Sequence, residues 1–391
     1  MRTLIRGARV LTLAGAARRG PATGDLGVRE GADVLLEGGR VAALAPALAE
    51  DADEVVEAKG RVLLPAFVDA HTHACWAGSR VAEWEQKLAG ATYLELLASG
   101  GGILATVRAT RAASVASLRQ GLEARLGAMF ALGTGAVEVK SGYGLSTEAE
   151  LRMLAAIAGA AHPAPVRLTA CIGHAKDAEV PDFVARTLEE TLPAVTAAHP
   201  GAVVDAYCEE GAWSVGETER LVRGARAAGH EVRLHVDQFH DLGAVEALLP
   251  HGVRSFDHLE ASTPETLRRL AESDAFGVML PASGFHLDDR YADGRAFLDA
   301  GGRLALGTNL NPGSAPGPSM PFVIALAVRK LGLTPAEALY AATRQAAELL
   351  ELPERGRIEV GASADVLLLA TTDERELAWA FGAPLVARRF G

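Results

Sequence analysis

Two histidines separated by one residue, His71 and His73, directly follow a mostly apolar stretch at 62–68. Side chains two positions apart on an extended chain point to the same side, so both imidazoles can reach one point. Neutral imidazole is a common protein ligand for zinc and iron. The spacing therefore predicts half of a metal site at the end of a buried strand. A pair of histidines that only bond to water is the alternative interpretation.

Strand-like apolar segments alternate with helical patterns over most of the chain. The eight segments are 62–68, 136–140, 166–172, 202–208, 231–236, 253–258, 276–281 and 303–308. Eight such units predict an α/β fold, a (β/α)8 TIM barrel, whose active site lies at the carboxyl ends of the strands. A doubly wound parallel sheet is the structural alternative, but it would scatter the polar strand ends instead of bringing them together.

The two ends of the chain have a different pattern from the middle. Short strands and turns fill residues 1–61, and the same style returns at 354–391. We therefore predict a small composite β-sandwich domain built from 1–61 plus 354–391. The barrel would then occupy residues 62–353.

Polar residues follow nearly every predicted barrel strand, which indicates a shared site because barrel strand ends converge. Metal chemistry favours three nitrogen ligands, His71, His73 and His235, with a position left open for water. His258 follows the next strand, where it could orient or deprotonate that water. A carbamylated Lys140 that bridges two metal ions is the alternative. Four other histidines fall in connecting segments and are expected at the surface: His162, His199, His230 and His251.

The composition narrows the function classes. Lysine and arginine total 38 against 49 acidic residues in 391, a formal net charge of −11, which argues against binding to nucleic acid or to anionic membranes. Arginines interrupt the first ten residues, so a signal peptide is not expected. The three cysteines, Cys75, Cys171 and Cys208, form no CxxC pair and suggest a reducing cytoplasm. These features fit a cytoplasmic protein whose partner is neither nucleic acid nor a membrane.

Several motifs carry a family resemblance. The segments 65–73 and 356–365 resemble the amidohydrolase superfamily. Further motifs, at 73–80, 98–103, 106–111, 138–145, 235–238, 257–260 and 311–314, resemble the imidazolonepropionase family in chain order. The resemblance covers essentially the whole chain.

The resemblance implies an activity and a site. That family hydrolyses the cyclic amide of 4-imidazolone-5-propanoate to N-formimidoyl-L-glutamate in histidine degradation, uses one Zn(2+) or Fe ion, and is generally a cytosolic homodimer. It implies that His71, His73 and His235 bind metal. It also implies that substrate or product is held by Arg80, Tyr93, Tyr143, His174, Gln238, Asn311, Gly313 and Ser314. Arg80 could clamp the propionate carboxylate with paired hydrogen bonds.

One position departs from the family pattern. The family has an aspartate, a metal ligand and proton acceptor, where this chain has Asn309. Asparagine can offer a carbonyl oxygen to the metal but accepts no proton. We therefore predict weaker metal binding, with His258 as the base beside the uncharged Gln238. Two other functions stay open: an aminohydrolase for another heterocycle, and a weakly active or non-catalytic metal or ligand binder.

Overall fold

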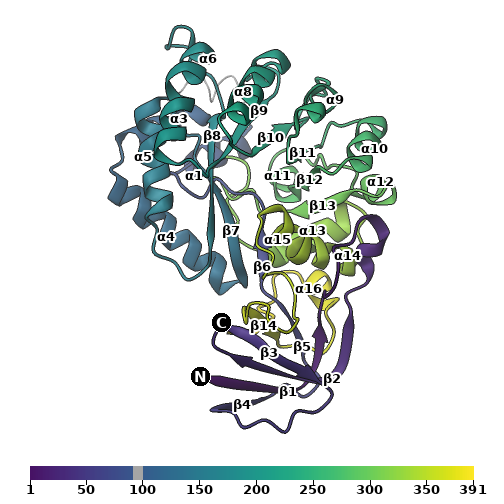
Figure 1. Cartoon of the computed structure of the whole chain (residues 1–391). Coiled ribbons are helices and arrows are strands. Elements are labelled where there is room, and N and C mark those ends of the chain that lie inside the picture. Colours follow the sequence, from purple (N-terminus) through teal and green to yellow (C-terminus); the bar gives the residue numbers. More distant parts are fainter. Residues whose placement is uncertain (91–99) are drawn as a thin grey trace.

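The computed structural model describes residues 1–90 and 100–391, and its larger part is a closed parallel barrel (Figure 1). Its eight strands, each paired with the next, are β6 (Phe67–Asp69), β7 (Thr134–Lys140), β8 (Val166–Gly173), β9 (Val203–Cys208), β10 (Val232–Val236), β11 (Ser255–His258), β12 (Phe276–Met279) and β13 (Arg303–Leu306). Two backbone hydrogen bonds close the ring just beyond the strand ends: Ala70 N–H donates to Leu306 O (3.3 Å), and Asn309 N–H donates to His71 O (2.9 Å). The predicted (β/α)8 barrel is confirmed.

Helices follow the strands and cover the outside of the barrel (Figure 1). They include α1 (Val81–Leu88), α3 (Ile103–Ala112), α4 (Val115–Ala131), α5 (Thr147–Ala158), α6 (Phe183–Arg186), α7 (Leu192–Ala198), α8 (Val215–Ala227), α9 (Ala244–Leu248), α10 (Pro264–Glu272), α11 (Pro281–His286), α12 (Gly294–Asp299), α13 (Met320–Lys330), α14 (Pro335–Tyr340) and α15 (Ala346–Leu349). Capping boxes begin α8 and α14, where Ser214 and Thr334 accept from the backbone N–H three residues on. Among the described residues, no helix combines the length and the apolarity needed to cross a bilayer.

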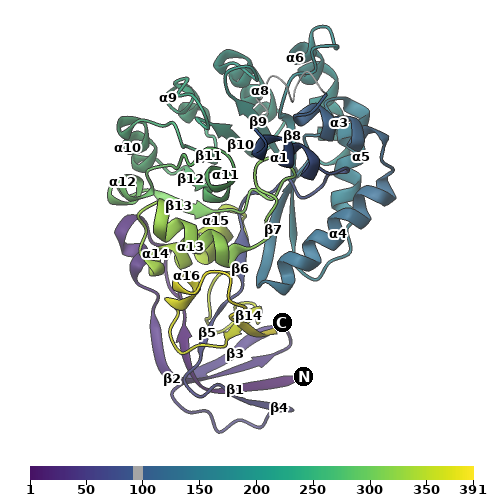
Figure 2. The ribbon, with the colours of Figure 1, turned by 180° about the vertical axis from the view of Figure 1, so that it is seen from behind.

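A second, mixed sheet joins the two ends of the chain (Figure 2). Its strands are β1 (Arg2–Leu11), β2 (Val28–Glu37), β3 (Arg40–Ala45), β4 (Glu54–Glu57), β5 (Val62–Pro65), β14 (Val366–Leu369) and β15 (Val386–Phe390). They lie in the order β15-β14-β5-β1-β2-β3, with β4 paired to β1. The helix α16 (Glu376–Trp379) connects the two C-terminal strands. The expected second domain built from both chain ends is therefore present.

The stretch predicted as one strand at 62–68 serves two sheets instead. Ala66 N–H donates to Asp365 O in the small sheet (3.0 Å), whereas Phe67 N–H donates to Gly133 O beside the barrel (3.0 Å). Pro65, which has no N–H, ends β5 just before this change of partner. The prediction of one continuous strand was wrong. We keep the domain limits, 1–61 plus 354–391 and 62–353, as a proposal.

Candidate metal centre and active site

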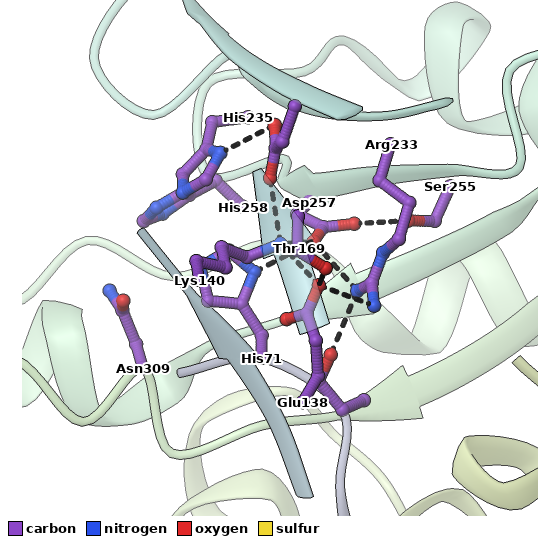
Figure 3. A network of polar contacts seen from close by, with 12 residues as sticks. His71, Glu138, Lys140, Thr169, Arg233, His235, Ser255, Asp257, His258 and Asn309 are labelled. Atoms are coloured by element: carbon purple, nitrogen blue, oxygen red, sulfur yellow. Dashed lines mark hydrogen bonds and ion pairs between the residues drawn. The ribbon is translucent and has the colours of Figure 1, made fainter. Parts of the chain in front are cut away.

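The three histidines predicted as metal ligands meet at the carboxyl ends of the barrel strands. His71 and His73 follow β6, and His235 lies in β10. The imidazole centroids of His71 and His235 are 4.5 Å apart, those of His73 and His235 5.1 Å, and those of His71 and His73 5.3 Å. All three side chains are buried. Figure 3 shows His71 and His235 beside His258, with Asn309 across from them.

The donor atoms of these side chains fit a metal ion. The Nε2 atoms of His73 and His235 are 3.0 Å apart. Two nitrogen ligands at about 2.0–2.1 Å from a tetrahedral metal would be about 3.3 Å apart. Two buried atoms at the site have no hydrogen-bond partner among the described residues: Nε2 of His71 and Oδ1 of Asn309. Buried polar atoms are normally paired, so unpartnered ones gathered at one place fit a site for an ion.

The acid–base state of the histidines suits metal binding. Burial holds the pKa of His71 and His235 well below the usual range, and the positive charge of Lys140 lowers both further. Burial, then His174, lowers the pKa of His73 in the same way. A lowered pKa keeps an imidazole neutral at neutral pH. Neutral imidazole is the form that binds a metal.

Asn309 lies where the fourth predicted ligand was expected, just after β13. Its Nδ2 donates to Ser283 Oγ (2.7 Å), which turns the unpartnered Oδ1 away from that bond. Its backbone is left-handed, with φ at 52°, and Asp237 (52°) and His258 (92°) share this conformation at other strand ends. Non-glycine residues in this conformation cluster at functional sites, because the surrounding structure must hold them there.

His258, at the end of β11, combines a fixed hydrogen bond with a position at the site. Its Nδ1 donates to both carboxylate oxygens of Glu260, at 3.1 and 3.2 Å. This bond leaves Nε2 as the acceptor nitrogen. Nitrogen atoms of His71, His235 and His258 all lie within 4.8 Å of one another. His258 therefore presents a proton acceptor next to the candidate metal ligands.

His174 lies close enough to be a ligand, but its ring is turned the wrong way. One nitrogen each of His73, His174 and His235 lies within a common 4.8 Å. The rings of His73 and His174 are stacked, with centroids 4.5 Å apart and planes 12° apart. An ion lies in the plane of each imidazole that binds it, so stacked rings cannot share one ion. Burial lowers the pKa of His174 to about 4. Its Nδ1 donates to Gly142 O (3.0 Å). His174 thus offers a neutral acceptor beside the site.

Arg80 lies against the turn at 311–314, but much of its guanidinium is already occupied. Its Nε donates to Glu83 Oε2 (2.6 Å), and a second guanidinium nitrogen pairs with the other oxygen of Glu83. A Cβ at Gly313 would lie 3.3 Å from Arg80 Nη1. Glycine therefore lets the turn approach the arginine closely. A clamp by Arg80 on a substrate carboxylate would have to share the side chain with Glu83.

The side chain of Asn311 organises this turn from within. Its Oδ1 accepts from the backbone N–H groups of Gly313 and Ser314, both at 2.8 Å. Its Nδ2 donates to Asn309 O and to Ser314 Oγ, both at 2.7 Å. The backbone N–H groups of Gly313 and Ser314, two residues that the resemblance implies hold substrate, are thus engaged inside the turn.

Two further predicted residues line the site, and one lies outside the described residues. Tyr143 is buried, and its ring centroid lies 5.9 Å from that of His73. Gln238 follows β10, and its Oε1 accepts from Tyr207 Oη (2.9 Å). The NH2 group of Gln238 therefore faces away from this bond. Tyr93 falls within 91–99, outside the residues that the structure describes.

The sequence did not predict which charged side chains inside the barrel contact the metal ligands. Asp205 accepts from His235 Nδ1 (3.0 Å), and Asp257 accepts from His71 Nδ1 (2.7 Å). The Lys140 ammonium pairs with carboxylates: its Nζ lies 2.7 Å from Asp205 Oδ2 and 2.8 Å from Glu138 Oε1. A carbamate there would place a negative charge against them, which disfavours that alternative. A single charged residue within an apolar strand, as at Asp205, was the available signal.

The histidines expected at the surface divide into two groups. His162, His199 and His251 are partly exposed, but His230 is buried, and its Nδ1 donates to Ala202 O (2.8 Å).

A cavity of about 300 Å³ opens at the other end of the barrel, lined by residues such as Arg167, His199, Glu231 and Glu351. Because barrel active sites lie at the carboxyl ends of the strands, we do not assign this cavity to the reaction.

Comparison with known proteins identifies relatives of this chain. The profile of the amidohydrolase family matches residues 62–385. An imidazolonepropionase of Deinococcus radiodurans is 43% identical over 371 residues, which cover 95% of this chain and 93% of the relative. One of Herpetosiphon aurantiacus is 43% identical over 397 residues, covering 97% and 93%.

Solved structures share the fold at low sequence identity. A variant atrazine chlorohydrolase of Arthrobacter aurescens, complexed with zinc and atraton, has a TM-score of 0.69 at 18% identity and covers 99% of this chain and 93% of its own. N-isopropylammelide isopropylaminohydrolase of Burkholderia multivorans has a TM-score of 0.66 at 20% identity, with coverage of 97% and 94%. At these identities the likeness shows the barrel with its second domain and nothing finer.

Proposed function

Since the chain belongs to the amidohydrolase family, we propose that its site hydrolyses the cyclic amide of 4-imidazolone-5-propanoate to N-formimidoyl-L-glutamate, a step of histidine degradation. The observation that carries the proposal is the convergence of three buried imidazoles at the strand ends. It occurs in a chain that is 43% identical to an imidazolonepropionase over 95% of its length. In the reaction, the hydroxyl of water joins the ring carbonyl carbon and the amide C–N bond breaks. The proton passes to the departing nitrogen.

We assign the metal to His71, His73 and His235, with Oδ1 of Asn309 as a neutral fourth donor. Imidazole and amide oxygen donors suit either Zn(2+) or Fe. When bound, such an ion polarises the amide carbonyl and makes water a better nucleophile at neutral pH. Whether the ion is zinc or iron is decided by elemental analysis of the purified protein.

His258 is the proposed general base. Glu260 holds its Nδ1–H, so Nε2 is free to take the proton from the attacking water and to return it to the leaving nitrogen. Gln238 is proposed to orient the substrate: Tyr207 fixes its Oε1, which leaves its NH2 group to donate to the reacting amide. Neither Asn309 nor Gln238 can take the proton at neutral pH.

The remaining predicted residues would hold the substrate. Tyr143 and His174 offer flat surfaces beside His73 for the imidazolone ring. Arg80 is proposed to donate hydrogen bonds to the propionate carboxylate from Nη1, the guanidinium nitrogen next to Gly313. Asn311 and Ser314 shape that turn, and Tyr93 completes the set that the resemblance implies.

A second candidate function follows from Asn309. Because an amide carries no charge, the metal could be held weakly and hydrolysis could be slow, which would make the protein a ligand binder. An ultraviolet assay of imidazolone propionate consumption, run with elemental analysis, separates the two. Turnover at saturating Zn(2+) or Fe supports the enzyme. Tight binding of formimidoyl-glutamate without turnover under the same conditions supports the binder. Release of ammonia from another heterocycle would select an aminohydrolase.

We further propose that the protein acts in the cytoplasm as a homodimer, as the family resemblance implies. Light scattering of the purified chain tests the dimer, and cell fractionation tests the compartment. A monomer at micromolar concentration would contradict the first statement.

A further inference from the structure

Five charged side chains lie buried inside the barrel, and two of them contact candidate metal ligands (Figure 3). They come from four of the barrel strands, β7, β9, β10 and β11, and each is at most 1% exposed. We call them the barrel ion network: Glu138, Lys140, Asp205, Arg233 and Asp257. Three carboxylates there face two cations.

One arm of the network reaches His71. Asp257 Oδ2 accepts from His71 Nδ1 at 2.7 Å. The same carboxylate accepts from Arg233 Nη2 (2.9 Å) and from Ser255 Oγ (2.5 Å), and Lys140 Nζ lies 3.7 Å away. Several groups therefore fix Asp257, and the loss of one would leave the others in place.

The other arm reaches His235 and depends on one residue. Asp205 Oδ1 accepts from His235 Nδ1 at 3.0 Å, and Asp205 Oδ2 accepts from Lys140 Nζ at 2.7 Å. Among the described residues, no other side chain bonds to Asp205. A carboxylate that accepts from Nδ1–H fixes the tautomer of the imidazole and leaves the Nε2 lone pair for a metal.

We propose that Lys140 is a positioning residue for metal binding, which holds Asp205 and, through it, the ring of His235. The inference rests on the proposed metal site and adds to it a residue that contacts neither metal nor substrate. Lys140 Nζ also donates to Glu138 Oε1 (2.8 Å) on its own strand, so the ammonium is anchored on the side away from Asp205.

The direction of the change in metal affinity distinguishes a positioning role of Lys140 from a direct effect of its charge. An ammonium close to a cation site repels the cation, so a role through charge alone predicts that removing it strengthens metal binding. A positioning role predicts the opposite. Without Lys140, Asp205 has only His235 as a side-chain partner and can turn, which releases the imidazole from one orientation.

The test measures the affinity of the full chain for Zn²⁺ by competition with a chromophoric chelator. We expect Lys140→Met to weaken Zn²⁺ binding about 10- to 100-fold, the usual effect of removing such a supporting contact. Glu138→Gln is the matched control: it also alters a Lys140 partner inside the barrel but leaves the contact of Lys140 with Asp205. We expect less than about a threefold change there. Equal or tighter binding by Lys140→Met would overturn the proposal.

A double-mutant cycle with Asp205→Asn tests whether Lys140 acts through Asp205. If Lys140 acts through Asp205, adding Lys140→Met to Asp205→Asn costs no further affinity. Losses that multiply would overturn the proposal. The variant with both substitutions has no unpaired charge at positions 140 and 205. If Lys140→Met alone does not fold, the comparison of this double variant with Asp205→Asn still tests the proposal.

A spectroscopic readout complements the affinities. The visible absorption of bound Co²⁺ reports ligand geometry, and we expect its bands to shift in Lys140→Met and to stay unchanged in Glu138→Gln. Unchanged bands in Lys140→Met would overturn the proposal, and so would a failure of the unsubstituted chain to bind Zn²⁺ or Co²⁺. Failure of ring opening in a chain that binds metal would instead count only against the proposed function.

Discussion

The barrel and the small sheet contain opposite kinds of interior. The core of the small sheet is apolar, with Ile5, Val10 and Val34 all fully buried. Inside the barrel, Lys140 and Arg233 are buried to the same degree but lie among carboxylates. Water is thus excluded from apolar side chains in the small sheet and from charged side chains inside the barrel.

The two interiors contribute differently to the protein. Apolar burial is favourable wherever it occurs and has no preferred direction. A buried ion pair loses hydration and often adds little net stability, but its hydrogen bonds fix directions. We infer that the small sheet contributes stability, whereas the barrel ion network uses its charges to orient His71 and His235. Four substitutions or conditions test this division.

The largest effect is expected for Arg233→Met. Arg233 forms ion pairs with Asp257 (2.9 Å) and Glu138 (3.0 Å), so its loss leaves two buried carboxylates short of a partner. We expect the free energy of unfolding to fall by about 3–5 kcal/mol. Denaturant unfolding followed by circular dichroism measures it. Arg388→Met, which removes an exposed ion pair with Glu54 from the small sheet, is the control and should change little. Similar losses of unfolding free energy in both variants would contradict this role of the buried charges.

Next in size is Ile5→Ala in the core of the small sheet. Ile5 is fully buried in β1, and its truncation should lower the free energy of unfolding by about 2–4 kcal/mol. Because the small sheet takes no part in the site, kcat/KM of the folded variant should stay within about twofold. A tenfold loss of kcat/KM, measured well below the unfolding transition, would show that the small sheet also positions the site.

Asn309→Asp should raise metal affinity and activity, with a smaller change in free energy than the two substitutions above. An aspartate would place a negative charge where Oδ1 of Asn309 now lies unpartnered, so Zn²⁺ affinity and kcat/KM should both rise by about tenfold. Chelator competition and the ultraviolet assay measure the two quantities. Asn311→Asp adds the same charge two residues away, within the turn, and should bring no gain in affinity. Absence of any gain in Asn309→Asp would contradict the assignment of this position as a ligand.

The smallest effect concerns pH. The pKa of His71, His73 and His235 lies well below the usual range, chiefly through burial. A lowered pKa means that protons compete with metal only at more acidic pH, so Zn²⁺ affinity should change less than about threefold between about pH 7.5 and 6. A peptide of residues 65–76, with exposed histidines, should lose affinity over this range. A parallel loss by the whole protein would show that burial does not protect the imidazoles.

Much of the fold was predictable because its signals are local. Alternation of strand and helix patterns predicted the barrel, and two β-rich ends predicted the second domain. The division of 62–68 at Ala66 was not predictable, since both halves are apolar and only their partners differ. The surface prediction for His230 failed for a similar reason: its partners, Ala202 and Thr196, lie far along the chain.

The sequence by itself determined that His71 and His73 share a direction, because that depends only on the two-residue period of an extended chain. The strand-end position of His235 followed from the same kind of pattern. Only the tertiary structure decided which carboxylate meets which imidazole. His71 and Asp257 are 186 residues apart, and they meet because barrel closure brings β6 and β11 around one interior. Register and closure are properties of the whole chain, so the support beneath the metal site could be seen only in the folded molecule.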